Sequence, residues 1–234
     1  MILISIIIPV HNEESTILTL LKRLNQLKDN TNFEIIIIND GSTDKTKKII
    51  DDHADLYHIV QHLEFNQGKG KAIIEGLKIS TKDYVFFQDA DLEYDPSDLS
   101  KFISIANNFQ ADFIMGSRFI GEKRSVIHFW HMIGNKVITF IFNLLNNTVF
   151  TDIYCCYCLF IRKNLPINRL RSKGWGQQAE ILTYLAQNSK KTFETAVDYD
   201  GRNYSEGKKI RYHHVFEVIY WICTTKIKVL FFKQ

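Results

Sequence analysis

Apolar runs and helical periodicities alternate along the first half of the chain. Four segments predict buried strands, at Ile2–Ile8, Phe33–Ile38, Leu56–Gln61 and Tyr84–Gln88. Segments with apolar residues at helical spacing separate them, at Glu13–Leu27, about Thr43–Asp52 and Lys69–Ile79. Strands that are apolar without alternation and separated by helices form a parallel sheet covered on both faces. The pattern therefore predicts an α/β doubly wound fold.

The N-terminal apolar run and two further apolar segments raise the question of a membrane. The N-terminal run lacks a basic start and ends at Pro9, so we expect neither a signal peptide nor a spanning segment there. Ile127–Leu145 and Val215–Phe232 are interrupted by polar and charged residues and do not predict spanning helices. Each has the periodicity of a helix packed on the core and also of a helix lying among lipid headgroups, and both alternatives stay open.

Composition narrows the protein class. The 234 residues are 45% apolar and 24% charged, which suits one core with a short C-terminal appendage. The net charge of +3 comes from 29 basic residues interspersed with 26 acidic ones, so nucleic acid is not an expected partner. Three of the four cysteines crowd at Cys155, Cys156 and Cys158, without the spacing of a zinc site or a disulfide framework. We expect reduced, buried thiols and a cytoplasmic protein.

Polar residues follow three of the predicted strands, where ligands bind in sheets of this kind. These loops are Pro9–Glu14, Asn39–Asp44 and Asp89–Glu93. Acidic loops that share one sheet edge require a cation or a ligand rich in hydrogen-bond donors. We therefore expect the binding site at this edge.

Asp89 and Asp91 are the sharpest chemical feature. Residues two apart at a strand end point to the same side, so both carboxylates can bind one hard cation, Mg²⁺ or Mn²⁺, and Glu93 could extend the set. Such an ion stabilises the charge on a departing nucleotide diphosphate. The alternative is that one of these aspartates caps the next helix, for which Asp98 is better placed. A phosphatase with an Asp-x-Asp nucleophile fits less well, because those aspartates usually follow the first strand.

Two other loops have a functional and an ordinary interpretation. Asn39–Ser42 is either a turn into a helix or the place where Asp40 binds the base or ribose of a nucleotide. Asn66–Lys71 is glycine-rich but lacks the spacing of a dinucleotide loop or a P-loop. It suits a close approach of the backbone to a ligand, with Lys69 or Lys71 beside it.

Five motifs together resemble one family. In order they are Pro-Val-His-Asn-Glu-Glu from Pro9, Asn-Asp-Gly-Ser-Thr-Asp from Asn39, Asn-Gln-Gly-Lys-Gly from Asn66, Asp-Ala-Asp-Leu-Glu-Tyr-Asp-Pro from Asp89, and Gly-Ser-Arg-Phe from Gly116. The sequence resembles the family-two inverting glycosyltransferases of GT-A fold, in the branch of dolichol-phosphate mannose synthases and polyprenyl-phosphate glucosyltransferases. The resemblance runs to about Arg211. It implies a mostly parallel, Rossmann-like central sheet flanked by helices, with amphipathic helices at the C-terminus.

The resemblance also implies site residues. The residues that bind the nucleotide sugar would be Pro9, His11, Asn12, Glu13, Asp40, Gly41, Lys69, Gly70, Asp89, Ala90 and Lys208. Asp89, Asp91 and Glu93 would hold Mg²⁺ or Mn²⁺. The residues of the transfer step would be Asp91, Asp152, Arg118 and Arg202, with Glu180 on the acceptor side. Asp152 would serve as general base if the acceptor were an alcohol, whereas a lipid phosphate is already ionised.

The implied reaction moves a hexose from a UDP- or GDP-sugar to an acceptor, a polyprenyl or dolichyl phosphate. Residues 1–120 would form the nucleotide-sugar half of a 1–211 domain, residues 121–211 the acceptor half, and residues 212–234 a helix able to contact a membrane surface peripherally. The acceptor half departs from the branch at Tyr154, Cys155 and Gln177–Ala179. A nucleotide-sugar-binding protein with little turnover is therefore the alternative function.

Overall fold

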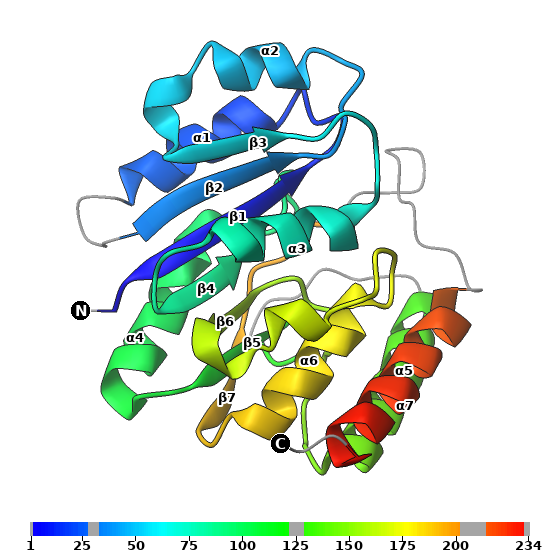
Figure 1. The fold of residues 1–234 in the computed structure, drawn as a ribbon. Coiled ribbons are helices and arrows are strands. Elements are labelled where there is room, and N and C mark those ends of the chain that lie inside the picture. The colour runs from blue at the N-terminus through cyan, green and yellow to red at the C-terminus, as the bar shows by residue number, and fades with distance from the viewer. Residues whose placement is uncertain (1, 28–32, 122–128, 202–213, 232–234) are drawn as a thin grey trace.

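The chain folds around a single seven-stranded sheet (Figure 1). The structure, a computed structural model, describes residues 2–27, 33–121, 129–201 and 214–231. In spatial order the strands are β3 (Ile59–His62), β2 (Phe33–Asn39), β1 (Ile4–Val10), β4 (Tyr84–Phe87), β6 (Cys158–Ile161), β5 (Phe113–Ser117) and β7 (Thr192–Ala196). All pair in parallel except β6, which is antiparallel to β4 and β5. This confirms the predicted α/β class with a mostly parallel sheet.

Helices cover both faces of the sheet. They are α1 (Ile17–Gln26), α2 (Thr46–Asp51), α3 (Lys69–Ile79), α4 (Leu99–Phe109), α5 (Phe129–Asn146), α6 (Gln177–Asn188) and α7 (His214–Phe231), and single 3₁₀ turns lie at Ala54–Leu56, Pro96–Asp98, Arg162–Asn164 and Ile167–Arg169. In Figure 1, α3 and α6 lie in front of the sheet, and α1 and α4 behind it. The central strands β1 and β2 are buried almost throughout, as their uninterrupted apolar sequences require.

Three predicted boundaries were wrong for local reasons. The residues before α1 and before α2 hydrogen-bond to each other's loop instead of joining the helix. Glu13 N donates to Thr46 Oγ1, and Thr43 N donates to Asn12 Oδ1. The helices therefore begin at Ile17 and Thr46. The third strand begins at Ile59, because the residues before it form a 3₁₀ turn.

The two late helices, α5 and α7, pack on the core and also expose apolar side chains, so a contact with lipid headgroups stays a prediction. Each has one buried face, represented by Phe142 of α5 and Ile222 of α7, and each keeps large apolar side chains exposed on another. These exposed side chains are Phe129, Trp130, Val137, Phe140 and Leu144 on α5, and Phe216, Tyr220, Ile227, Leu230 and Phe231 on α7. The helices pack against each other and α7 packs on α6 (Figure 1). None of the helices in the described ranges is both long and apolar enough to cross a membrane.

Candidate functional site

The three polar loops meet at one edge of the sheet. Val10 pairs with Asn39 at the ends of β1 and β2, and Gln88 N donates to Ile7 O at 3.1 Å where β4 ends. Asp40 N donates to Val10 O at 2.8 Å. The parallel register therefore brings the segments after β1, β2 and β4 together, as the sequence predicted.

The loops after β1 and β2 are joined by hydrogen bonds. Asn12 adopts a left-handed conformation (φ 56°), so that its N–H donates to Ser42 Oγ while its side-chain oxygen accepts from Thr43 N. His11 Nδ1 lies 2.8 Å from Asp40 O and must carry the proton, because a carbonyl only accepts. Pro9 pairs with Ile38 just before this point, and Glu13 follows it. Most of the predicted nucleoside-binding set is thus one preformed surface.

Asp40 is buried and holds the glycine-rich loop. Its two carboxylate oxygens accept from Gln67 N and Gly68 N, each at 2.8 Å. Gly41 beside it has φ +62°, and a Cβ there would lie 2.4 Å from the carbonyl carbon of Phe65. Asp40 therefore organises the loop before α3, and its contact with a nucleoside stays a prediction.

Lys69, not Lys71, lies at the acidic loop. Lys69 Nζ is 2.5 Å from Asp89 Oδ1 and 3.6 Å from Cys156 Sγ, whereas Lys71 turns away to pair with Glu75. Burial lowers the pKa of Lys69, but the Asp89 carboxylate outweighs it and raises that pKa above its ordinary value. Gly70 N donates to Lys173 O, which lies too close to Gly70 to leave space for a Cβ. Ala90, between the two aspartates, is buried.

Asp91 and Glu93 form a second part of this loop. Leu92 is left-handed (φ 61°), and Asp91 Oδ1 accepts from Glu93 N at 3.1 Å. Glu93 Oε2 accepts from Tyr199 Oη at 2.8 Å. Within the described residues, no group of three or more His, Cys, Asp or Glu side chains is arranged to hold a metal ion.

The capping alternative for the aspartates was wrong, and so was the expected cap. Asp95 caps the following 3₁₀ turn by accepting from Ser97 N. Asp98 makes no capping hydrogen bond, and its carboxylate instead binds Lys101 and the backbone of Asp198. Neither Asp89 nor Asp91 is used to start a helix, so both carboxylates remain at the sheet edge.

Arg118 and Asp152 form a bidentate pair. Arg118 Nε and NH2 donate to the two oxygens of Asp152 at 2.7 and 2.9 Å, and Asn135 Nδ2 donates to Asp152 Oδ1 at 2.8 Å. Burial raises the pKa of the fully buried Asp152, but Arg118 and Asn135 outweigh this and hold it below its ordinary value. This pairing fixes the Arg118 guanidinium. A role of Asp152 as general base for an alcohol acceptor stays a prediction.

Tyr199 connects the two carboxylate centres, and no motif in the sequence identified it. Its ring lies 5.1 Å from the Arg118 guanidinium while its hydroxyl binds Glu93. Tyr199 forms an antiparallel bridge with Tyr94, and Asp200 N donates to Glu93 O. Long-range contacts of this kind leave no periodic signal in a sequence.

Glu180 and the altered acceptor-half residues are structural partners of nearby loops. The buried Glu180 carboxylate accepts from Arg171 N and Ser172 N, which fixes the loop that contacts Gly70. Tyr154 Oη donates to Trp175 O, and Gln178 Nε2 donates to Cys155 O. These hydrogen bonds give Glu180 a structural role within the described residues, and its predicted place on the acceptor side stays a prediction. The three clustered cysteines are buried and unpaired, as predicted.

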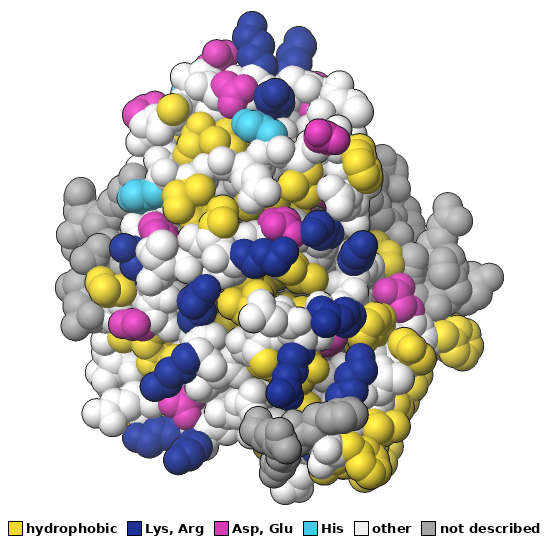
Figure 2. All heavy atoms as spheres, in the orientation of Figure 1, with side chains coloured by type: hydrophobic (Ala, Val, Ile, Leu, Met, Phe, Trp, Pro, Cys, Tyr) yellow, Lys and Arg dark blue, Asp and Glu magenta, His cyan; other side chains and the backbone are white. Residues whose placement is uncertain are grey.

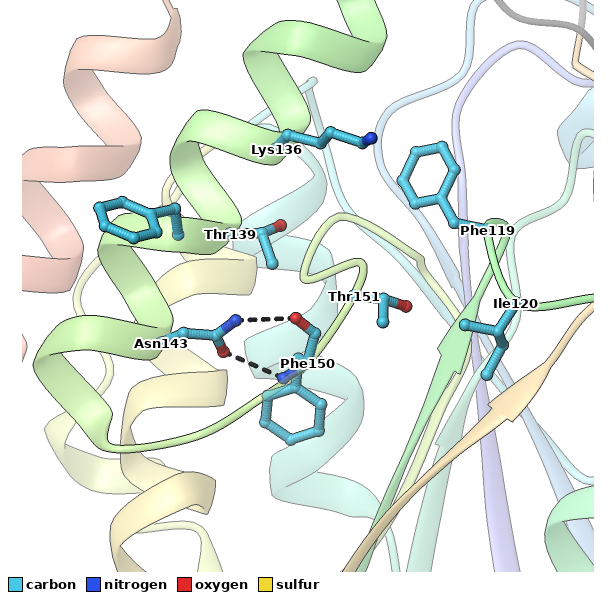
Figure 3. Close-up of a pocket in the computed structure, with 8 residues that line it drawn as sticks. Phe119, Ile120, Lys136, Thr139, Asn143, Phe150 and Thr151 are labelled. Atoms are coloured by element: carbon cyan, nitrogen blue, oxygen red, sulfur yellow. Dashed lines mark hydrogen bonds between the residues drawn. The ribbon is translucent and has the colours of Figure 1, made fainter.

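A pocket of about 410 Å³ opens beyond Arg118 (Figure 3). Its lining comes from the segment after β5, from α5 and from the start of the following loop: Phe119, Ile120, Lys136, Thr139, Phe140, Asn143, Phe150 and Thr151. Figure 3 shows the Lys136 side chain extending towards Phe119 across the pocket. Asn143 donates to Phe150 O and accepts from Phe150 N, which fixes the pocket floor. Arg202 and Lys208, both predicted site residues, lie outside the described residues.

Comparisons with known proteins identify the family of this chain and its relatives. The model of the family described as Glycosyl transferase family 2 matches residues 5–166. The chain is 28% identical over 231 residues to an uncharacterised protein of Methanocaldococcus jannaschii, covering 94% of this chain and 93% of that one. It is also 28% identical over 250 residues to the UDP-N-acetylglucosamine-dolichyl-phosphate N-acetylglucosaminyltransferase of Methanococcus voltae, covering 97% of this chain and 98% of that one.

A solved structure has the same fold. Glucosyl-3-phosphoglycerate synthase from Mycobacterium tuberculosis, in complex with Mn²⁺, UDP and phosphoglyceric acid, superposes with a TM-score of 0.72 at 18% identity. The match covers 96% of this chain and 78% of that one, which confirms the predicted GT-A fold. Motifs, fold and family match together lead to one conclusion: the chain belongs to glycosyl transferase family 2 and is a glycosyltransferase.

Proposed function

We propose that this glycosyltransferase moves a hexose from a UDP- or GDP-sugar to a polyprenyl or dolichyl phosphate. The observation that carries the proposal is the position of Arg118. Through Tyr199 it is linked to the Asp89–Glu93 loop, and through the adjoining Phe119 it borders the pocket. A cation therefore lies between an edge suited to a nucleotide diphosphate and a pocket with an apolar lining.

The donor would bind at the joined loops after β1 and β2. Pro9, His11, Asn12 and Glu13 would contact the nucleoside together with the Asp40–Gly41 turn. Their mutual hydrogen bonds mean that little ordering is required when the donor binds. The Mycobacterium tuberculosis enzyme of the same fold was solved with UDP, which supports a nucleotide as a ligand of this fold.

A divalent ion fits the acidic loop. Asp89 and Asp91 offer hard oxygen ligands, which suit Mg²⁺ or Mn²⁺, and such ions typically use one or two protein carboxylates and complete their shell with substrate phosphates and water. Glu93 would support the loop through Tyr199. The ion would neutralise charge on the departing nucleotide diphosphate.

The acceptor phosphate would meet Arg118 and Lys136. An ionised phosphate needs no general base, which agrees with the low pKa and complete pairing of Asp152. Arg118 uses two of its N–H donors for Asp152 and retains others for an anion. The inversion of the sugar requires the phosphate oxygen to attack in line, so fixing Arg118 would fix the line of attack.

The exposed apolar side chains of α5 and α7 would contact the lipid bilayer that holds such an acceptor. Phe140 connects the two features, because it lines the pocket and its side chain is 66% exposed. Figure 2 shows apolar side chains gathered over these helices, beside a face rich in Lys and Arg. Amphipathic helices of this kind bind at the level of the headgroups. Phe140→Asp should reduce flotation with anionic phospholipid vesicles, whereas Phe109→Asp, exposed on α4, should not.

This proposal assigns residues 1–120 to the donor, 121–211 to the acceptor and 212–234 to membrane contact. Its test is a titration of purified protein with UDP- and GDP-sugars, with and without Mn²⁺, followed by addition of polyprenyl phosphate. Nucleotide release that depends on metal and lipid supports the transferase and identifies its donor. Asp91→Asn should abolish metal-dependent nucleotide binding. Metal-dependent binding without release on the lipid would contradict the acceptor assignment and favour the binding-protein alternative.

A further inference from the structure

Lys69 forms an ion pair with Asp89, a carboxylate that the proposed metal would also bind. Its Nζ is 2.5 Å from Asp89 Oδ1, and the two side chains are 46% and 16% exposed. We propose that Lys69 is a displaceable counterion: it neutralises Asp89 in the donor-free protein, competes with the divalent ion for that carboxylate, and moves to the donor's diphosphate when metal and nucleotide bind. This inference rests on the proposed function and concerns the order in which its components assemble.

Only the end of the Lys69 side chain is free to make this move. Lys69 is the first residue of α3, and the backbone on either side is held by Gly68 N to Asp40 and by Gly70 N to Lys173 O. The ammonium group, by contrast, reaches Asp89 through a flexible four-carbon side chain that is 46% exposed. Displacement therefore needs a change of side-chain rotamer and no rearrangement of the loop.

Charge explains why the ammonium and the metal exclude each other. A metal ion bound to Asp89 Oδ1 would lie next to the Lys69 ammonium group. Two neighbouring positive charges repel more strongly at a partly buried site than in water. A diphosphate supplies negative charge for both cations. The metal should thus bind weakly alone and tightly together with the nucleotide.

Cys156 provides Lys69 with a second neighbour in this position. Its sulfur lies 3.6 Å from Nζ and next to Asp89, and burial raises the pKa of the thiol. A neutral thiol does not compensate an ammonium charge. Asp89 is thus the group that holds the Lys69 ammonium, and a diphosphate can compete with Asp89 for that ammonium.

The test is a Mn²⁺ titration followed by the electron paramagnetic resonance signal of free Mn²⁺, with and without UDP. Without nucleotide, Lys69→Met should bind Mn²⁺ about three- to fivefold more tightly than the wild type, the range expected for removing one partly exposed ion pair. Lys71→Met is the matched control, because it removes the same charge two residues further along the chain. Lys71 pairs with Glu75 and not with Asp89. It should leave the affinity unchanged, and Lys69→Arg should keep it near the wild-type value.

Added UDP should then reduce or reverse the difference, because Lys69 would serve the diphosphate. Equal Mn²⁺ affinity of wild type and Lys69→Met without nucleotide, together with an increase on adding UDP, overturns the counterion role while the proposed function stands. Absence of Mn²⁺ binding in every variant, with and without UDP, overturns the metal assignment and this inference with it. Circular dichroism of each variant establishes that it is folded.

Discussion

The proposed donor edge and the proposed acceptor region are built in different ways. At the donor edge, the loops after β1 and β2 bind each other through short side-chain to backbone hydrogen bonds, such as Asn12 to Thr43 and Asp40 to Gly68. In the acceptor region, a buried ion pair, Arg118–Asp152, lies beside an open pocket and two helices with exposed apolar side chains. One region is fixed by backbone geometry and the other by side-chain pairing.

This difference predicts where each region tolerates change. Hydrogen bonds to the backbone need particular φ and ψ angles. The donor edge should therefore be sensitive to replacement of its glycine and asparagine residues, such as Gly41 and Asn12. The acceptor region relies on one desolvated charge pair, whose disruption leaves an uncompensated charge. The apolar side chains exposed on α5 and α7 contribute less to folding, because they stay accessible to solvent. Substitutions can separate these cases.

The largest expected effect is that of Asp152→Ala. The fully buried carboxylate accepts from Arg118 and Asn135, so its loss leaves a largely buried guanidinium unpaired and should cost about 3–5 kcal/mol of unfolding free energy. Urea denaturation measures it. Asp83→Ala, at an exposed position, should change stability by less than about 0.5 kcal/mol. A loss below about 1 kcal/mol for Asp152→Ala would contradict the importance of the pair.

The pH dependence of the same pair is the second effect. Although burial raises the pKa of Asp152, Arg118 and Asn135 hold the folded-state pKa below the unfolded value of about 3.9. Its contribution is therefore complete above that unfolded value and is lost as pH falls through the folded pKa. The difference in unfolding free energy between wild type and Asp152→Asn should be constant at neutral pH and shrink in acid. A difference that grows in acid would refute this pairing.

Gly41→Ala tests the donor edge and should cost about 1–3 kcal/mol. The residue has φ +62°, and its Cβ would lie 2.4 Å from the Phe65 backbone. The matched change in the acceptor region is Gly134→Ala in α5, where an added Cβ meets nothing within 4 Å. That variant should gain about 0.5–1 kcal/mol through helix propensity. Thermal and urea unfolding compare them, and equal effects would mean that the two regions do not differ as described.

Tyr199→Phe has the smallest expected effect, about 1 kcal/mol, because it removes one hydrogen bond and keeps the ring beside Arg118. Tyr220→Phe, on the exposed part of α7, is the control and should be neutral. A neutral Tyr199→Phe would mean that the Glu93 contact does not stabilise the link between the two regions. Urea denaturation resolves the comparison.

Local patterns were sufficient for much of the fold. Apolar continuity and spacing predicted the strands β1, β2 and β4 and the helix α3. A strand that is buried on both faces has apolar residues at consecutive positions, so the local sequence indicates it. The boundaries of α1, α2 and β3 were missed, because they depend on hydrogen bonds to another loop or on a short turn. The family was predicted from motifs at strand ends and is confirmed.

By itself the sequence determined the α/β class, the family and the edge of the sheet where polar residues gather, since each follows from residues close together in the chain. Only the tertiary structure decided that Lys69 and not Lys71 reaches Asp89, that Asp152 fixes Arg118, and that Tyr199 joins Arg118 to Glu93. These pairs involve residues from 20 to more than 100 positions apart, as the 106-residue separation of Tyr199 and Glu93 illustrates. Their contacts depend on strand order and helix packing, which no local pattern records.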